Sequence, residues 1–248
     1  MREYWTLTRR ELGGYFLALT GYIIMAAAVL AMGVGFWLVL SRLQGEAKTM
    51  PVIEWWSPCI LLIATLTTPL ITMRLFAVEK ATGTIETLMT APVTERQVVL
   101  AKFSAAMIFY ATMWLPLLGC AWVVRHYAGE VTGLDQATLA SVFVGVLLFG
   151  AVGIAFGCCA SAMTRSQVVA AVLGFVFGFA LLALGIFGHL VPTRADWQSE
   201  ALAALAFFEQ MHDFSRGIID TRAIVLYLSL ALFFLFVTLR VVESRRWK

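Results

Sequence analysis

The sequence is poor in charge. Only 13% of its 248 residues are Asp, Glu, Lys or Arg, while 61% are hydrophobic. A soluble domain carries roughly 25% charged and about 45–50% apolar residues, so this chain has too few polar side chains to cover a surface that faces water. The composition therefore predicts an integral membrane protein, and a net charge of +3 gives no indication of a nucleic-acid partner.

The sequence also lacks the usual motifs of nucleotide binding, metal binding and catalysis. It contains no G-x-x-x-x-G-K-[ST] loop, no H-E-x-x-H motif and no histidine pair at metal-ligand spacing. Its four cysteines are interpreted as small buried hydrophobic residues, with a pairing of Cys59 and Cys120 left open. We expect no catalytic residue, metal site or cofactor in this chain, so that energy for any work must come from a partner.

Six stretches contain no Asp, Glu, Lys or Arg, namely 12–41, 55–73, 103–124, 136–164, 166–193 and 223–239. About 20 helical residues cross a hydrocarbon core of about 30 Å, and each stretch can supply such a helix. We therefore predict an all-α membrane protein with one domain over residues 1–248 and spans near 17–40, 57–77, 97–124, 137–163, 168–191 and 222–242. No charge lies deep within a span, which argues against coupling to protons or ions.

The distribution of Lys and Arg predicts the orientation. Twelve of the 18 basic residues fall on the side that carries both chain ends, and six fall on the other. Because Lys and Arg are enriched on the cytoplasmic side, both termini are predicted to be cytoplasmic.

Local signals predict three features of the spans. Ser57-Pro58 is typical of an N-cap followed by proline and predicts the start of the second span. Thr94 and Gln97 fit a capping box at the start of the third span. Pro69 and Pro116 lie within spans and predict kinks there.

Two cytoplasmic segments are predicted to be amphipathic helices. Residues 2–16 place Arg9 and Arg10 opposite an apolar face, as in a helix lying in the headgroup plane, although a solvated leader is an alternative. After Gly83, residues 84–90 place Ile85, Leu88 and Met89 on one side and Glu86 on the other. This short helix can dock in a groove of a soluble protein or rest on the lipid surface.

The same loop resembles the signature of ABC-2 type permeases, the membrane subunits of one class of ATP-binding-cassette transporters. The matching motif is Glu79-Lys80-x-x-Gly83-Thr84-Ile85-Glu86-x-Leu88-x-x-x-Pro92-Val93, followed by Lys102. The tail, from Phe214 to Arg222 and then Glu243-Ser244-Arg245-Arg246-Trp247, is similar to the permeases of gliding motility and of nitrous-oxide-reductase maturation.

The resemblance implies two permease chains and two ATPase chains in a bacterial inner membrane, with ATP and Mg²⁺ on the ATPase. It makes residues 1–16 the elbow helix and residues 84–90 the coupling helix. An auxiliary periplasmic or membrane protein is a further candidate partner. The residues assigned to ATPase coupling are Glu79, Lys80, Gly83, Thr84, Ile85, Glu86, Leu88, Met89 and Arg165.

Three further groups of residues lead to predictions. A polar stripe in the second span, made of Thr65, Thr68 and Thr72 beside Pro69, can line a pathway or pack against helices, and packing is favoured. The glycines of Gly153-x-x-x-Gly157 and Gly174-x-x-x-Gly178 predict close packing of a hairpin made by spans four and five. The outer segment before the last span predicts a re-entrant amphipathic helix or a plain interfacial loop, because Phe207, Met211, Phe214 and Ile218 recur there at helical spacing. Its candidate residues are Phe207, Met211, Phe214, Arg216 and Gly217.

The favoured function is a permease that exports a substrate, or transmits force, when a partner ATPase closes on ATP. A membrane anchor or scaffold of a multiprotein assembly is the main alternative, and an intramembrane enzyme is a third.

Overall fold

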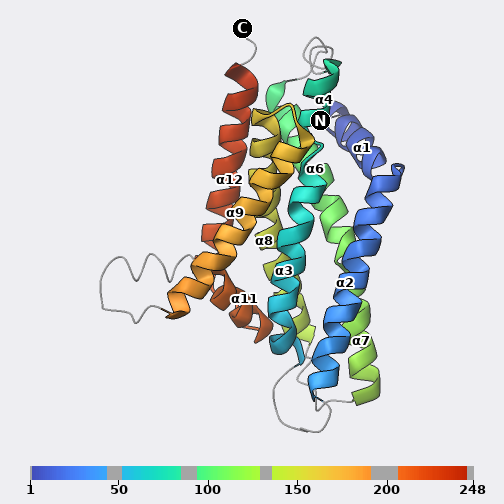
Figure 1. Ribbon diagram of the computed structural model, residues 1–248, viewed down its shortest axis with the longest axis vertical. Helices are drawn as coiled ribbons and strands as arrows, with labels where there is room; N and C mark the ends of the chain where they lie inside the picture. Colours follow the sequence, from blue (N-terminus) through green and yellow to red (C-terminus); the bar gives the residue numbers. More distant parts are fainter. Residues whose placement is uncertain (1, 44–51, 85–93, 129–135, 191–205, 245–248) are drawn as a thin grey trace.

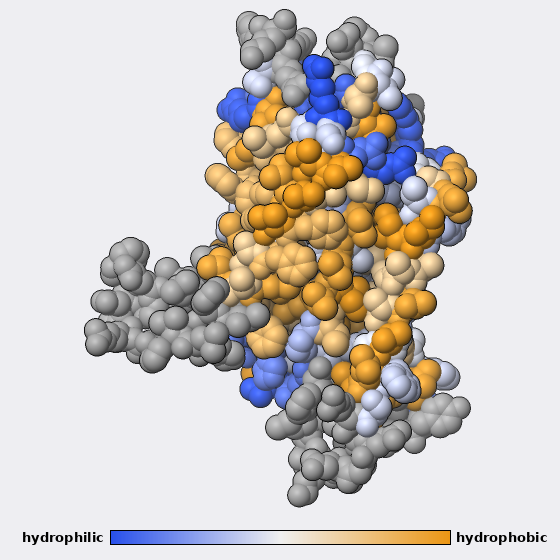
Figure 2. All heavy atoms as spheres, in the orientation of Figure 1, coloured by the Kyte–Doolittle hydropathy of each residue, from blue (hydrophilic) through white to orange (hydrophobic). Residues whose placement is uncertain are grey.

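The chain is a bundle of long helices. The computed structural model describes residues 2–43, 52–84, 94–128, 136–190 and 206–244, and within these ranges it contains helices and no strand. Six helical stretches in the described ranges are long and apolar enough to cross a membrane: Leu19–Ser41, Trp56–Thr82, Glu95–Val123, Gln136–Met163, Gln167–Gly185 and Thr221–Glu243. The predicted all-α fold with six spans is confirmed. Hydrophobic side chains surround the middle of the bundle, and hydrophilic ones gather toward its ends (Figure 2).

Helix α1 (Arg2–Phe16) has the predicted range and lies beside α6 (Glu95–Met113). Its Tyr4 hydroxyl donates to Ser104 Oγ at 2.6 Å. The chain turns sharply into α2 (Leu19–Leu43), and this turn requires a glycine because a Cβ on Gly21 would overlap the Tyr15 carbonyl oxygen. Helices α1 and α4 (Ala77–Thr82) and the C-terminal end of α12 (Thr221–Glu243) lie at one end of the bundle, called here the α1 end (Figure 1).

Helix α3 (Val52–Thr72) begins before the predicted start. The prediction that Ser57 caps this helix is wrong, since Ser57 and Pro58 both lie inside it. Proline has no N–H and leaves the carbonyl four residues earlier without its helical donor. Here that carbonyl belongs to Glu54, and the Ser57 hydroxyl donates to it at 2.8 Å. Ser57 therefore supplies the hydrogen bond that Pro58 cannot make inside the helix, and does not start the helix as predicted.

The predicted span 97–124 consists of two helices, α6 and α7 (Leu115–Ala128). The capping box at the start of α6 is confirmed, because Thr94 and Gln97 exchange hydrogen bonds. The break falls at Trp114, two residues before Pro116. Pro116 cannot donate to the Thr112 carbonyl, and the Trp114 N–H donates to the Ala111 carbonyl three residues earlier at 3.2 Å, which tightens the end of α6.

Helix α8 (Gln136–Met163) lies at the centre and packs against α3, α6, α9 (Gln167–Leu190), α11 (Phe207–Ser215) and α12. Three residues separate α8 from α9, so the predicted hairpin of the fourth and fifth spans is present. Helix α2 is more peripheral, and Leu30 and Trp37 on it are exposed as expected of side chains that face lipid. All four cysteines are free, and Cys158 and Cys159 are buried in α8.

Candidate functional site

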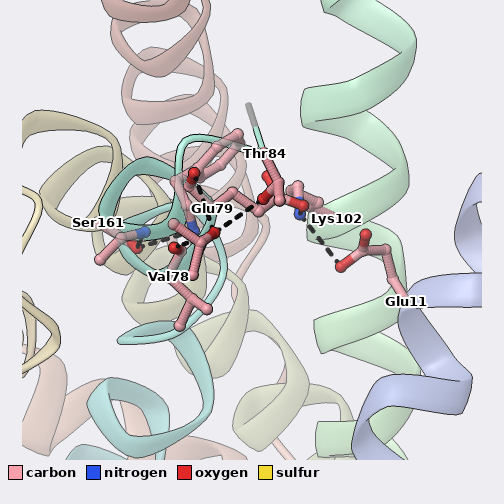
Figure 3. A network of polar contacts seen from close by, with 9 residues as sticks. Glu11, Val78, Glu79, Thr84, Lys102 and Ser161 are labelled. Carbon is pink, nitrogen blue, oxygen red and sulfur yellow. Dashed lines mark hydrogen bonds and ion pairs between the residues drawn. The ribbon is translucent and has the colours of Figure 1, made fainter. Parts of the chain in front are cut away.

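The buried ammonium group of Lys102 joins three elements at the α1 end. Its side chain is only 2% exposed, and its Nζ lies 2.8 Å from Glu79 Oε1 and 3.2 Å from Glu11 Oε2. Figure 3 shows Lys102 extending from α6 between Glu11 of α1 and Glu79 of α4. The ammonium also lies 5.3 Å from the centroid of the Phe76 ring. We call Lys102, Glu11 and Glu79 the ionic triad.

The triad is a fixed structural link because a buried ion is stable only when its charge is compensated. Removal of one partner from a buried ion pair costs about 3–5 kcal/mol, since it leaves the other charge without compensation. Any displacement of α4 that separates Glu79 from Lys102 meets this resistance. Movement of α4 is therefore tied to movement of α1 and α6.

A second link holds the turn between α3 and α4 to the centre of the bundle. The Oγ of Ser161, on α8, accepts hydrogen bonds from the backbone N–H groups of Phe76 and Ala77, both at 3.0 Å. The same hydroxyl donates to the Met73 carbonyl at 3.3 Å. Ser161 is fully buried. One side chain of α8 thus satisfies three backbone groups where the chain leaves α3.

The structure describes four of the residues assigned to coupling in the loop after α3. Glu79 and Lys80 lie on α4. Glu79 is half-buried, and Lys80 is only 6% exposed. Gly83 ends α4 with φ +75°, a left-handed conformation that favours glycine. The Thr84 hydroxyl lies 2.9 Å from that of Thr82. Ile85, Glu86, Leu88 and Met89 lie outside the described residues.

Arg165 is not part of this cluster. It lies in the short connection between α8 and α9, where its side chain is exposed. The triad and Arg165 are both found toward the α1 end, but no described contact joins them.

The threonine stripe of α3 faces glycines rather than an open path. Added Cβ atoms on Gly153, Gly157 and Gly178 would come closest to Thr68, Thr72 and Thr65 respectively, and one on Gly174 would lie 2.9 Å from Pro69 Cβ. The Thr65 and Thr72 hydroxyls donate to the Leu61 and Thr68 carbonyls of their own helix. These contacts favour helix packing. The glycine motifs therefore allow α8 and α9 to approach α3 closely. The sequence had predicted instead that these glycines pack α8 against α9.

The segment before the last span contains a short helix, α11, and its re-entrant role stays a prediction. Phe207, Met211 and Phe214 share its buried face, and Arg216 Nε donates to Glu54 Oε1 at 2.9 Å. Gly217 follows with φ +80°. Ile218 does not continue the helical spacing of these residues, since α11 ends at Ser215 and Ile218 lies beyond it and is 54% exposed.

Sequence reasoning named Lys102 but missed its partners. Lys102 falls on the face of α6 that also carries the buried residues Val98, Ala105, Ala106 and Phe109. A lysine in a buried stripe requires a carboxylate partner, and this signal was available in the sequence. Helical periodicity does not show which carboxylates pair with Lys102, because Glu11 and Glu79 lie on separate elements.

The fold and the site together define a multi-pass membrane protein whose α1 end is held by a buried ionic link. In the part of the chain that the structure describes, no three His, Cys, Asp or Glu side chains form a group able to hold a metal ion. The sequence model of the ABC-2 family transporter proteins matches residues 15–214. The chain therefore belongs to the ABC-2 transporter family, as a transport subunit within the membrane. None of the curated proteins compared with it matches.

Proposed function

We propose that this chain is the permease half of an ABC exporter whose ATP hydrolysis occurs on a separate ATPase subunit. Two copies of the chain and two ATPase chains form the transporter, and ATP and Mg²⁺ bind the ATPase. The complex lies in a bacterial inner membrane with both termini of this chain in the cytoplasm. The excess of Lys and Arg on the side of the termini supports this orientation.

The observation that carries the proposal is the ionic triad beside the loop that resembles a coupling helix. Residues 84–90 follow Gly83, the residue that ends α4, and α4 is held to α1 and α6 through Glu79, Lys102 and Glu11. A force applied to residues 84–90 by a docked ATPase reaches α4 first. The triad and Ser161 then transmit it to α1, α6 and α8, the last of which is the central helix.

In this mechanism α1 is the elbow helix and α11 is the re-entrant helix at the outer side. The position of α11, packed against α3, α8 and α9, supports a role in closing the outer end of the bundle. The tail motif supports the branch of gliding-motility and nitrous-oxide-reductase-maturation permeases, in which an auxiliary periplasmic or membrane protein is a further expected partner.

The test is copurification from native membranes followed by measurement of ATP turnover. A tagged copy of this chain is expected to bring down an ATP-binding chain and to show vanadate-sensitive hydrolysis in lipid vesicles. Copurification of an assembly without an ATPase, together with an absence of turnover, would support the scaffold function instead.

A further inference from the structure

A cavity of about 280 Å³ opens at the α1 end between α1, α2, α3, α4 and α6, and we call it the α1 cavity. Its lining changes from polar to apolar along two helices. On α2, Thr20 lies at the start of the helix and Ile24 lies one turn further in. After α3, Arg74 lies in the turn, whereas Leu70 lies about one turn deeper, toward the middle of the bundle. The α1 cavity is therefore amphipathic.

The charges on its wall favour an anion. Arg10, Arg74 and Lys102 stand against Glu11 and Glu79, which leaves one net positive charge. Lys102 is shared by both carboxylates, so its charge is already compensated.

The two arginines are available to a ligand. The Arg74 guanidinium donates to the Thr20 hydroxyl at 2.5 Å, and among the described residues Arg10 has no ion-pair partner. Both side chains are exposed at the rim. Guanidinium groups match the geometry of phosphate oxygens, with which they form paired, charge-assisted hydrogen bonds.

We propose that the α1 cavity binds the headgroup phosphate of an anionic phospholipid of the cytoplasmic leaflet. A volume of about 280 Å³ corresponds to about nine water molecules. This is room for a phosphate and the glycerol that carries it, but not for the acyl chains. The chains leave along the aliphatic side of Ile24 and Leu70, into the membrane. The proposal requires that the α1 end face the cytoplasm, where anionic lipids attract basic segments of proteins. It does not require an ATPase partner.

The binding experiment uses the purified full-length chain in detergent, titrated with phosphatidylglycerol and observed by native mass spectrometry. The double variant Arg10→Gln/Arg74→Gln removes both rim charges and is expected to weaken binding by about tenfold or more. The matched control is Arg9→Gln/Arg96→Gln, which removes two exposed charges that do not line the α1 cavity. It is expected to retain normal binding.

A second variant fills the cavity and keeps every charge. Gly14 lies on the cavity wall, and a Cβ there would meet nothing within 4 Å. Gly14→Leu also improves helix propensity, so that the protein is expected to fold, while lipid binding falls by about tenfold. Gly33→Leu is the control, since Gly33 lies on α2 outside the α1 cavity and also has open space around its Cβ position.

Three results would overturn the proposal. Equal losses in the two arginine double variants would show general attraction of lipid to basic surface. Normal binding by Gly14→Leu would place the lipid elsewhere. Displacement of phosphatidylglycerol by millimolar glycerol 3-phosphate would show that the site binds soluble phosphate esters. The proposal expects no such displacement. It also expects phosphatidylcholine to bind at least tenfold more weakly than phosphatidylglycerol.

Discussion

The hydroxyl oxygen of Ser161 accepts a hydrogen bond from the backbone N–H of Phe76, a residue 85 positions earlier in the chain. Because the same oxygen accepts from Ala77, the start of α4 depends on one side chain of the central helix. This contact places a polar group where the glycine-rich pattern of α8 had suggested only close packing.

Ser161→Ala is expected to lower stability and to disturb transmission through α4. The substitution leaves two buried N–H groups without their acceptor, at a cost of about 1–3 kcal/mol for each group that water does not reach. Thermal unfolding in detergent measures the loss of stability. Vanadate-sensitive turnover with the ATPase bound is expected to fall as well.

The matched control for this variant is Ser141→Ala on the same helix. Ser141 is also buried, but among the described residues its hydroxyl has no hydrogen-bond partner. Its removal should therefore change neither stability nor turnover by much. Similar losses in both variants would mean that Ser161 matters only as a buried small residue.

Lys102→Met is expected to destabilise the α1 end by about 3–5 kcal/mol, since it leaves the carboxylates of Glu11 and Glu79 facing each other without a cation. The measurement is thermal unfolding in detergent, compared with Lys102→Arg, which keeps the charge. Adding Glu79→Gln to Lys102→Met removes one of the stranded carboxylates and should restore part of the stability. Additive losses in the double variant would contradict the ionic triad.

Gly157→Ala is expected to be among the most damaging single-methyl additions in the chain. The new Cβ would overlap Thr72 Oγ1, and overpacking of this kind typically costs about 1–3 kcal/mol. Gly33→Ala adds the same methyl group to α2, where nothing lies within 4 Å of it. The midpoint of thermal unfolding should fall for the first variant and stay or rise for the second. Equal midpoints would refute the close contact between α8 and α3.

The membrane spans could be predicted from the sequence more completely than the site at the α1 end. Charge-free stretches locate all six spans, because lipid excludes charged side chains from the middle of a span. The capping box of Thr94 and Gln97 was predictable because it involves residues three apart. Ser57 was misassigned because the same serine–proline pair can start a helix or repair its interior, and the local sequence does not separate the two.

The ionic triad could not be derived from local sequence. Lys102 and Glu79 are 23 residues apart, and Glu11 is on a third helix, so their meeting depends on how α1 and α4 pack against α6. The three hydrogen bonds of Ser161 likewise join α8 to the end of α3. The triad and the Ser161 contacts both depend on how the helices pack against one another, whereas the periodicity of the sequence predicts only which face of each helix is buried.

The predicted orientation can be tested with single cysteines and an impermeant thiol reagent. The predicted topology places positions 47 and 198 outside and positions 82 and 245 in the cytoplasm. In intact cells, cysteines at the first two positions should be labelled above the level of the unmodified chain, and those at the last two should not. Thr82 is exposed at the end of α4, so that a cysteine there is accessible from its own side. Its labelling from outside would invert the orientation.

The docking of an ATPase on residues 84–90 is tested most directly by Leu88→Asp. Leu88 lies on the apolar side of the helix that the sequence predicts there, so docking would bury the new carboxylate without a partner. That burial costs several kcal/mol, and each 1.4 kcal/mol is a factor of ten in affinity. Association with the ATPase should therefore weaken by more than a hundredfold. Pull-down of the ATPase and its vanadate-sensitive turnover are the measurements.

Glu86→Ala provides the graded comparison, because Glu86 lies on the polar side of the same predicted helix. Its loss should cost about 1–3 kcal/mol if a basic group on the ATPase is left unpaired, so binding should weaken less than in Leu88→Asp. Neither residue belongs to a span, and both variants are expected to insert and accumulate like the unmodified chain. Normal ATPase binding and turnover by Leu88→Asp would show that residues 84–90 do not form the docking helix. The ionic triad would then be a structural link alone, and the ATPase would have to dock on another part of the chain.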